Sequence, residues 1–237
     1  MKLTILTLAT VAICLAQSFE VTSVKANHSG SGPSRYPRLT KGKLSATNIT
    51  VKSMLEVAYG VNSQQIGGPA WIDSDRFDLA ATSPEGVADT EVKPMLQALM
   101  KDRFGLAAHI EMREMPVYNM VVGRDKLKIR PFDPAVAPLH PAMMPGATNA
   151  TAGNQTMPEI ADLLGRITGR PVIDKTGLEG RYAYFIQYGQ LGGTSGPEQA
   201  PDIFGAVQEQ LGLKLESARA SLRMIVVDNI NRTPTEN

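Results

Sequence analysis

The residues TVKSMLEVAY at positions 50–59 begin a stretch, Thr50–Lys126, that resembles a second stretch, Thr156–Asn231, which begins TMPEIADLLG. Four pairs of positions set the alignment at offsets of 105 to 107: Thr50-Val51 with Thr156-Met157, Arg76-Phe77 with Arg181-Tyr182, Gly105-Leu106 with Gly212-Leu213, and Val121-Val122 with Val226-Val227. An offset this constant means loops of similar length in both stretches. The sequence therefore predicts an internal duplication that gives two similar lobes.

Each stretch has the same predicted order of elements: helix, strand, helix and a final antiparallel hairpin. The first stretch gives a helix over 51–59 that Gly60 ends, a strand over 76–82, a helix over about 91–104 that Gly105 ends, and strands over 106–113 and 116–123. The second gives helices around Ile160–Ile167 and Ile203–Leu211, a strand over 182–186, and strands over 213–216 and 222–227. Strands over 19–25 and 43–48 precede the first stretch. We expect an α+β protein in which each lobe has two helices and a small, mainly antiparallel sheet.

The predicted domain organisation follows from these elements and from local composition. It has a signal peptide at 1–16, N-terminal strands and a loop at 17–48, a first lobe at 49–127, a linker at 128–155 and a second lobe at 156–237. The linker is rich in Pro, Ala, Gly and Met and has no usable periodicity, which indicates a mobile linker or a surface loop. Two further loops are expected, at 30–41 and 189–201.

The N-terminus is typical of a secretory leader: Lys2 precedes an apolar run, 3–15, and small residues surround Ala16. The run is shorter than the roughly 20 residues of a membrane span, so the mature chain is expected to be exported without a transmembrane segment. Cleavage after Ala16 removes Cys14, the only cysteine. A lipoprotein, with Cys14 lipidated, is the alternative, although Ile13 is bulky for the position before the lipidated residue.

Composition excludes several classes of protein. The net charge of +1 gives no field that would attract nucleic acid or an anionic membrane. Without Cys14 the mature chain has no disulfide or thiolate chemistry, which suits an oxidising compartment. We find no nucleophile motif, zinc-protease motif or phosphate loop, and we therefore expect no catalytic residue, no cofactor and no resident metal.

Five residues are the candidate contacts to a ligand or partner: Trp71, Asp73, Asp75, Asp174 and Arg181. Trp71, the sole tryptophan, either stacks on a ligand at a loop rim or pins the loop to the core. Asp73, Asp75 and the nearby Asp78 suggest either a calcium site or solvated strand-entry residues, and their spacing does not match an EF-hand.

Asp174-Lys175-Thr176-Gly177 is the string in which cation-pumping ATPases carry their phosphorylated aspartate. Those pumps also need several membrane spans and a nucleotide domain. We therefore interpret the string as a turn between two extended segments, in which the glycine permits a positive φ.

Two histidine patterns allow alternatives to a metal-free protein. His109 and Glu111 form half of a zinc deaminase motif, but the Pro-Cys-x-x-Cys half is absent. The pair is predicted to lie, with Arg113, on the wet face of a strand whose other face carries Ala108, Ile110 and Met112. His140 with Met143 and Met144 would suit a cuprous ion in an exported protein.

The chain as a whole resembles a family of uncharacterised, soil-associated secreted proteins that are abundant in Acidobacteria. The residues that carry the resemblance are FEVTSVK at 19–25, IGGP at 66–69, WID at 71–73, DRF at 102–104, PVY at 116–118, VIDKTGL at 172–178, GRY at 180–182 and QEQLGLKLE at 208–216. The family has no established catalytic residues. The resemblance implies an extracytoplasmic sensing or interaction role, because similar domains occur attached to membrane metallopeptidases of the beta-lactam sensor type.

These observations favour an exported, periplasmic or extracellular, noncatalytic module that binds a small ligand or a protein such as that metallopeptidase. The predicted contact surface is a groove between the lobes or an open strand edge. One alternative is a periplasmic hydrolase using Asp73, Asp75 or Asp174, which requires two carboxylates to converge in a cleft. The other is a cuprous-ion binder through His140, Met143 and Met144.

Overall fold

The computed structural model describes residues 18–30, 34–84, 87, 91–124, 127–136, 144, 147–189 and 200–235. The predicted leader and the loop over 190–199 lie outside these residues. The chain forms two compact units: unit 1 comprises Met1–Gly60, Pro69–Ala107 and Asp228–Asn237, and unit 2 comprises Val61–Gly68 and Ala108–Val227. Across the described residues there are four α-helices and several small, mostly antiparallel sheets. The α+β class predicted from the sequence is confirmed.

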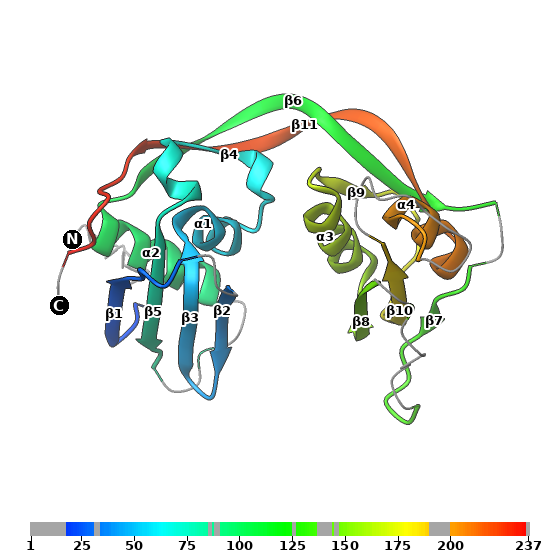
Figure 1. Cartoon of the computed structure of the whole chain (residues 1–237), viewed down its shortest axis with the longest axis horizontal. Coiled ribbons are helices and arrows are strands. Elements are labelled where there is room, and N and C mark those ends of the chain that lie inside the picture. The colour runs from blue at the N-terminus through cyan, green and yellow to red at the C-terminus, as the bar shows by residue number, and fades with distance from the viewer. Residues whose placement is uncertain are drawn as a thin grey trace, which may run out of the picture. The chain divides into compact units, whose positions relative to one another are not determined.

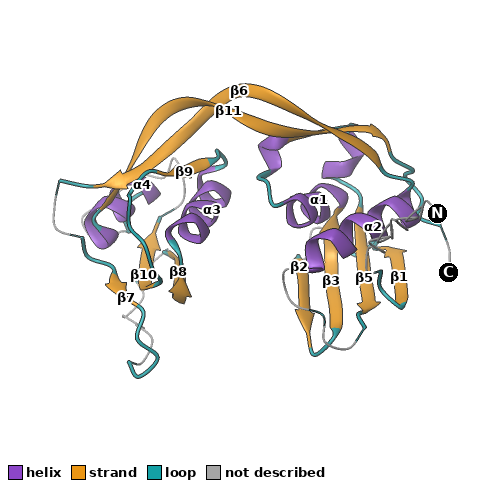
Figure 2. Cartoon of the chain, turned by 180° about the vertical axis from the view of Figure 1, so that it is seen from behind, coloured by secondary structure: helices purple, strands orange, loops and turns teal. Residues whose placement is uncertain are grey.

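Unit 1 is a four-stranded antiparallel sheet with two helices on one side (Figures 1 and 2). The strands are β1 (Val21–Ala26), β2 (Arg35–Thr40), β3 (Lys43–Thr50) and β5 (Arg76–Thr82), in the order β1-β5-β3-β2, and the helices are α1 (Val51–Tyr59) and α2 (Val92–Phe104). A short 3-10 helix, η2 (Ala70–Asp73), precedes β5. The predicted strands and helices of this region are confirmed, whereas β2 lies in a segment for which a loop was predicted.

Local sequence explains where the helices of unit 1 begin and end. The hydroxyl of Thr50 accepts a hydrogen bond from the backbone N–H of Ser53, which caps the start of α1. Gly60 and Gly105 follow α1 and α2 in the left-handed conformation that glycine adopts at lowest cost. Both helices bury their apolar stripe against β3 and β5, and Phe77 of β5 meets Phe104 of α2 edge to face at 5.2 Å.

Unit 2 contains two small sheets and two helical segments. Its first sheet has the order β7 (Arg130–Pro131), β10 (Tyr182–Tyr188), β8 (Thr148–Gln155), and its second has the order β4 (Ile66–Gly67), β11 (Leu213–Asn229), β6 (Ala107–Val122), β9 (Val172–Asp174). The helical segments are α3 (Met157–Thr168) and α4 (Ile203–Ala206), which continues as a π-helical turn over Val207–Leu211; a 3-10 turn, Ser63–Gln65, precedes β4. Apolar residues of α3, β10 and α4 form the main core of the unit.

Both predicted hairpins are wrong. Residues 106–123 contain one strand of 16 residues, β6, and residues 213–229 form one strand of 17 residues, β11. The two strands pair with each other (Figure 1). Their direction is antiparallel, because Gly123 bonds to Gly212 while Glu114 meets Arg219. Glu114-Met115 contains neither glycine nor asparagine, the residues that two-residue hairpin turns favour. The backbone N–H and C=O groups of each strand are instead hydrogen-bonded to a strand that is distant in the sequence.

The segment predicted as a linker, 128–155, contains two strands, β7 and β8, that flank β10. In β8, Ala150 and Ala152 fall on one face and Asn149 and Thr151 on the other, so a weak period-2 pattern was present. The segment is poor in large apolar residues, so the pattern was too weak to predict a strand. The half-exposed or exposed positions of β8 explain why large apolar residues are not needed there.

Several strand pairings recur along the chain at the offset of the sequence alignment. Lys43 pairs with Thr82 in unit 1 and Thr148 pairs with Tyr188 in unit 2, which are offsets of 105 and 106. In the sheet of unit 2, the parallel pair Ile66 with Ile225 matches the parallel pair Val172 with Tyr118. The corresponding residues of these pairs lie 105 to 107 positions apart.

Candidate functional site

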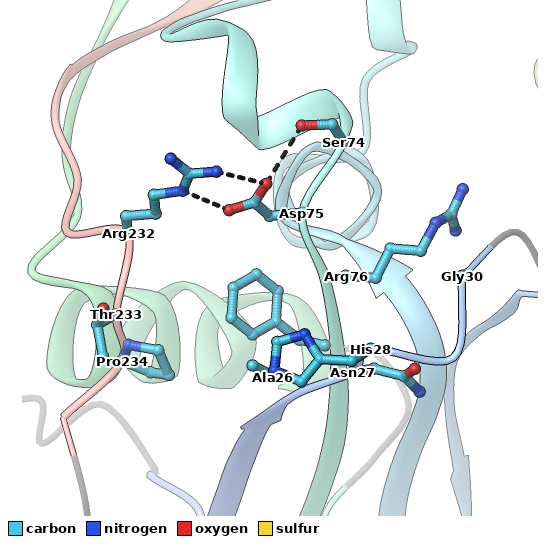
Figure 3. A pocket seen from close by; sticks show the side chains of 11 residues that line it. Ala26, Asn27, His28, Gly30, Ser74, Asp75, Arg76, Arg232, Thr233 and Pro234 are labelled. Carbon is cyan, nitrogen blue, oxygen red and sulfur yellow. Dashed lines mark hydrogen bonds and ion pairs between the residues drawn. The ribbon is translucent and has the colours of Figure 1, made fainter.

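A cavity of about 640 Å³ opens in unit 1 where β1 ends, β5 begins and the C-terminal segment passes (Figure 3). Its lining consists of Ala26, Asn27, His28, Gly30, Ser74, Asp75, Arg76, Phe77, Arg232, Thr233 and Pro234. Most of these residues are polar, and one carboxylate, one imidazole and two guanidinium groups are among them. The cavity is therefore suited to a polar or charged ligand.

Asp75 and Arg232 form the central contact of the cavity wall (Figure 3). Arg232 donates from Nε to Oδ2 of Asp75 at 2.6 Å and from Nη2 to Oδ1 at 3.1 Å. The hydrogen bond from Arg232 holds the pKa of Asp75 below its ordinary value of 3.8, and the same pairing raises the pKa of Arg232. Both groups are therefore charged at neutral pH. A two-point guanidinium–carboxylate contact also fixes orientation.

The elements on either side position this ion pair. The backbone N–H groups of Ser74 and Asp75 both donate to the carbonyl of Trp71, which ends η2 in a tight turn before β5. On the other side, Asn231 donates its backbone N–H to Phe104 at 2.7 Å and Thr235 donates its own to Arg103 at 2.8 Å. The C-terminal segment is thus attached to the end of α2 on both sides of Arg232.

A polar network holds the end of β1 against β5. Asn27 donates its side-chain amide to Oδ1 of Asp78 at 2.7 Å, and the same oxygen accepts the backbone N–H of Asn48 at 2.8 Å. These two bonds, the Asn27 bond first, lower the pKa of Asp78. Ser29 donates its backbone N–H to Asn27 Oδ1 at 2.8 Å, which makes a turn that leaves His28 exposed at the rim.

Arg76 contributes to the cavity mainly through its position at the start of β5. Its Nη1 donates to Ser34 Oγ at 2.8 Å and to the carbonyl of Asn48 at 2.9 Å. Figure 3 shows its guanidinium turned away from Arg232. Arg76 therefore ties β5 to β3, where Asn48 has a φ of +54°.

The structure brings one of the five predicted contacts, Asp75, into the cavity lining. Asp73 is exposed and pairs with Lys52 at 2.8 Å. Trp71 is half-buried in η2, and it does not line this cavity. Arg232 and Asn27, which fix the cavity, were not singled out from the sequence, and the C-terminal Arg232-Thr233-Pro234 carries no periodic signal that would have found them.

Asp174 and Arg181 belong to unit 2 and have local structural partners. Asp174 Oδ1 accepts hydrogen bonds from the backbone N–H of Thr176 at 2.9 Å and from its hydroxyl at 2.8 Å, and Gly177 has a φ of +68°. The turn interpretation of this string is confirmed. Arg181 donates to the carbonyl of Asn154, and its Nη2 approaches Glu159 at 3.3 Å.

The carboxylates considered for a hydrolase each have partners of their own. Asp73 and Asp75 are engaged by different cations, Lys52 and Arg232. A pKa below the ordinary value also makes Asp75 a poor general acid.

Metal ligands do not cluster in the described part of the chain, which contains no group of three or more His, Cys, Asp or Glu side chains that would hold an ion. His109 contacts Glu111 at 3.2 Å, and Arg113 contacts Glu111 at 2.9 Å, as expected for a wet strand face. The face that carries Ala108, Ile110 and Met112 is exposed as well, since Ile110 is 58% and Met112 66% exposed. Of the predicted copper ligands, His140 and Met143 lie outside the described residues.

No helix within the described ranges has the length and apolar character needed to cross a membrane. In a comparison with protein families, the model of DUF3738, described as a protein of unknown function, matches residues 23–230. The chain therefore belongs to the DUF3738 family. No curated protein matches the chain, and no solved structure matches it. The family description assigns no catalytic activity.

Proposed function

We propose that this chain is an exported, noncatalytic binding module and that its ligand or partner occupies the polar cavity of unit 1. The observation that carries the proposal is a cavity of about 640 Å³ whose wall is held by the two-point contact between Asp75 and Arg232. Its volume lies within the roughly 300–1,000 Å³ of small-molecule sites. The imidazole of His28 and the hydroxyl of Ser74 add hydrogen-bonding groups for a polar ligand.

Export is supported by the leader at 1–16 and by the resemblance to secreted proteins. Cleavage after Ala16 would make Gln17 the first residue of the mature protein. Expression of the full chain followed by N-terminal sequencing tests this. An N-terminus at Met1 contradicts export by this leader, and lipid on Cys14 supports the lipoprotein alternative.

We further propose that the two units derive from an internal duplication, on the strength of the shared offsets in sequence and strand register. The duplicated parts differ at one place that concerns the cavity. Ala26 of β1 pairs with Phe77, and at the corresponding position Pro131 of β7 pairs with Tyr182. However, β1 has six residues and β7 has two. The strand at the β1 position is thus long in unit 1 and short in unit 2, which supports a binding role for unit 1.

The partner proposed from the resemblance is an extracytoplasmic protein, with a membrane metallopeptidase of the beta-lactam sensor type as the first to test. A small ligand from the cell envelope or surroundings is the alternative occupant of the cavity. The noncatalytic role is supported by the ion pairs that engage Asp73 and Asp75.

A thermal-shift screen tests the proposal, using metals, cell-wall fragments, glycans, peptides and beta-lactams. A ligand at 100 times its Kd stabilises the protein by about 2.7 kcal/mol. For a ligand of the cavity, Arg232→Ala should remove the shift. Arg219→Ala is the matched control, because Arg219 also pairs with a carboxylate, Glu114, and is 64% exposed against 67% for Arg232. A shift that Arg232→Ala leaves unchanged contradicts the cavity as the binding site.

A further inference from the structure

The outer edge of β1 has backbone groups that are not used by its own sheet. β1 is the first strand in the order β1-β5-β3-β2, and among the described residues it pairs only with β5. Asn27 donates its N–H to Arg76 at 2.7 Å, and bonded residues alternate along an antiparallel pair. The N–H and C=O groups of Val24 and Ala26 therefore point away from β5. Neither backbone has a hydrogen-bond partner within the described residues.

A groove of about 460 Å³ runs beside this edge. One wall is Ser23, Val24, Lys25 and Ala26, and the other is Thr233, Pro234 and Thr235 of the C-terminal segment. Ala26, Thr233 and Pro234 also line the larger cavity. The two hollows therefore adjoin along the edge of β1, from Ser23 to Gly30.

Arg103 fixes the spacing of the two walls. Its Nε and Nη2 donate to the hydroxyl of Thr22 on β1 at 2.9 and 2.6 Å, while its carbonyl accepts the N–H of Thr235 at 2.8 Å. Arg103 thus contacts both walls from the end of α2. Pro234 has no N–H, so the C-terminal segment is unable to donate a ladder bond at this position. The wall formed by the C-terminal segment is therefore held in place, but it does not add to the sheet as a strand beside β1.

We propose that this groove binds an extended acidic peptide segment of a partner, which adds as a strand to the edge of β1. Strand addition supplies partners for Val24 and Ala26, as in other proteins that extend a sheet with a peptide. The lining of the two hollows carries Lys25, Arg76 and Arg232 against Asp75, a net charge of +2 with His28 neutral. Lys25 is exposed and has no ion pair in the part of the chain that the structure describes.

The inference deepens the proposed function, on which it rests, by naming the ligand class. It also accounts for the difference between β1 and β7, since a strand of two residues does not offer two outward-facing residues to an incoming peptide. Edge strands are otherwise protected against pairing, often by a lysine. Here the lysine lies in the lining of a groove, where it attracts a carboxylate.

The test uses the full chain with three fluorescent octapeptides of alternating sequence: (Glu-Val)4, (Lys-Val)4 and (Glu-Val)4 with every second backbone amide methylated. Binding is followed by fluorescence anisotropy and by amide hydrogen exchange. We expect (Glu-Val)4 to bind and to slow exchange at Val24 and Ala26. The lysine peptide and the methylated peptide are expected to bind at least about tenfold more weakly, which corresponds to 1.4 kcal/mol.

Two variants separate strand addition from surface attraction. Val24→Pro removes an outward N–H while leaving the bonds to β5, so (Glu-Val)4 should lose at least about tenfold in affinity. Lys25→Glu, at an exposed position that does not threaten folding, should weaken the acidic peptide, whereas Lys43→Glu on the same sheet is the control that should not. Equal affinity for the lysine peptide, for the methylated peptide or for the Val24→Pro protein would overturn the inference.

The remaining outcomes distinguish the inference from the proposed function. Small-molecule binding that depends on Arg232, without any peptide binding, leaves the cavity proposal standing and refutes strand addition. A concentration-dependent dimer that Val24→Pro dissociates, seen by sedimentation, refutes the peptide and identifies a second copy as the occupant. Peptide binding that Val24→Pro abolishes and Arg232→Ala does not affect supports strand addition and moves the site from the larger cavity to the groove.

Discussion

Arg232 holds both carboxylate oxygens of Asp75, a residue 157 positions earlier in the chain. This contact attaches the C-terminal segment to the start of β5, and it is the reason that unit 1 has a cavity with a defined wall. Backbone bonds from Asn231 and Thr235 to the end of α2 hold the same segment on either side. The contact depends on the charge of both groups, so a change of pH or a substitution of either residue should weaken it.

The lowered pKa of Asp75 predicts a pH dependence of the C-terminal segment. A carboxylate whose pKa is depressed on folding stabilises the folded state above its unfolded pKa, and this contribution is lost as the pH falls through the folded pKa. The contribution of Asp75 should therefore be complete near neutral pH and decline below pH 3.8. The protection of the backbone amides of residues 231–235, measured relative to their intrinsic exchange rates at each pH, should fall in that acid range. Asp75→Asn should show low protection at neutral pH and little further change in acid.

Arg181 is predicted to stabilise unit 2 without contacting the ligand. Its Nη2 donates to the carbonyl of Asn154 at 2.6 Å, and Asn154 holds a φ of +66°. Arg181→Ala removes this bond, and we expect a destabilisation of about 1–2 kcal/mol by urea unfolding, discounted toward the lower end because the side chain is half exposed. Binding to unit 1 should not change. If this variant instead loses ligand affinity while its free energy of unfolding is unchanged, Arg181 contacts the ligand, as the sequence predicted.

Arg76 in unit 1 makes a contact similar to that of Arg181 in unit 2, and the sequence alignment could predict part of this similarity. Arg76 and Arg181 stand at aligned positions, and each donates to the carbonyl of an asparagine with positive φ, Asn48 or Asn154. The alignment started at Thr50 and missed both asparagines, although they differ by the same 106 positions. Local signals such as helix caps, apolar stripes and glycine stops were sufficient for α1, α2 and α3.

Long-range pairing was not predictable from local signals. The partner of β6 is β11, about a hundred positions away, and alternation within a strand is the same whether its partner is the next segment or a distant one. The cavity residues could not be predicted from the sequence for the same reason. Asp75 stood in a suggestive acidic cluster, but Arg232, which pairs with it, lies in a tail without periodicity.

Tyr184 is predicted to make stability fall at alkaline pH. Its ring is 3% exposed, its hydroxyl donates to Gln155 Oε1 at 2.9 Å, and burial raises its pKa to about 12. The unfolded chain ionises this group near pH 10. The contribution of the neutral phenol is therefore fully present below pH 10 and is lost as the pH rises through about 12.

Urea unfolding of the wild type and of Tyr184→Phe, between pH 9 and 12, measures this contribution. The free energy of unfolding of the wild type should decline more steeply with pH than that of the variant. Parallel pH profiles would show that Tyr184 ionises near its ordinary pKa and is not protected by burial.

Gly105 offers the sharpest test of the local structure that supports the cavity. It ends α2 with a φ of +59°, and a Cβ at this position would lie 2.8 Å from Asn231 Nδ2. The left-handed conformation costs a non-glycine residue about 1–2 kcal/mol, and the clash falls on the residue that precedes Arg232. We expect Gly105→Ala to lower the free energy of unfolding by about that amount, because the Asn231 side chain can shift away, and to weaken the binding of cavity ligands through that shift. Gly67→Ala is the control, since a Cβ there meets nothing within 4 Å. Unfolding of both variants at the same urea concentration as the wild type would contradict the described attachment of the C-terminal segment to the end of α2. It would also mean that this attachment does not fix the cavity wall formed by Arg232.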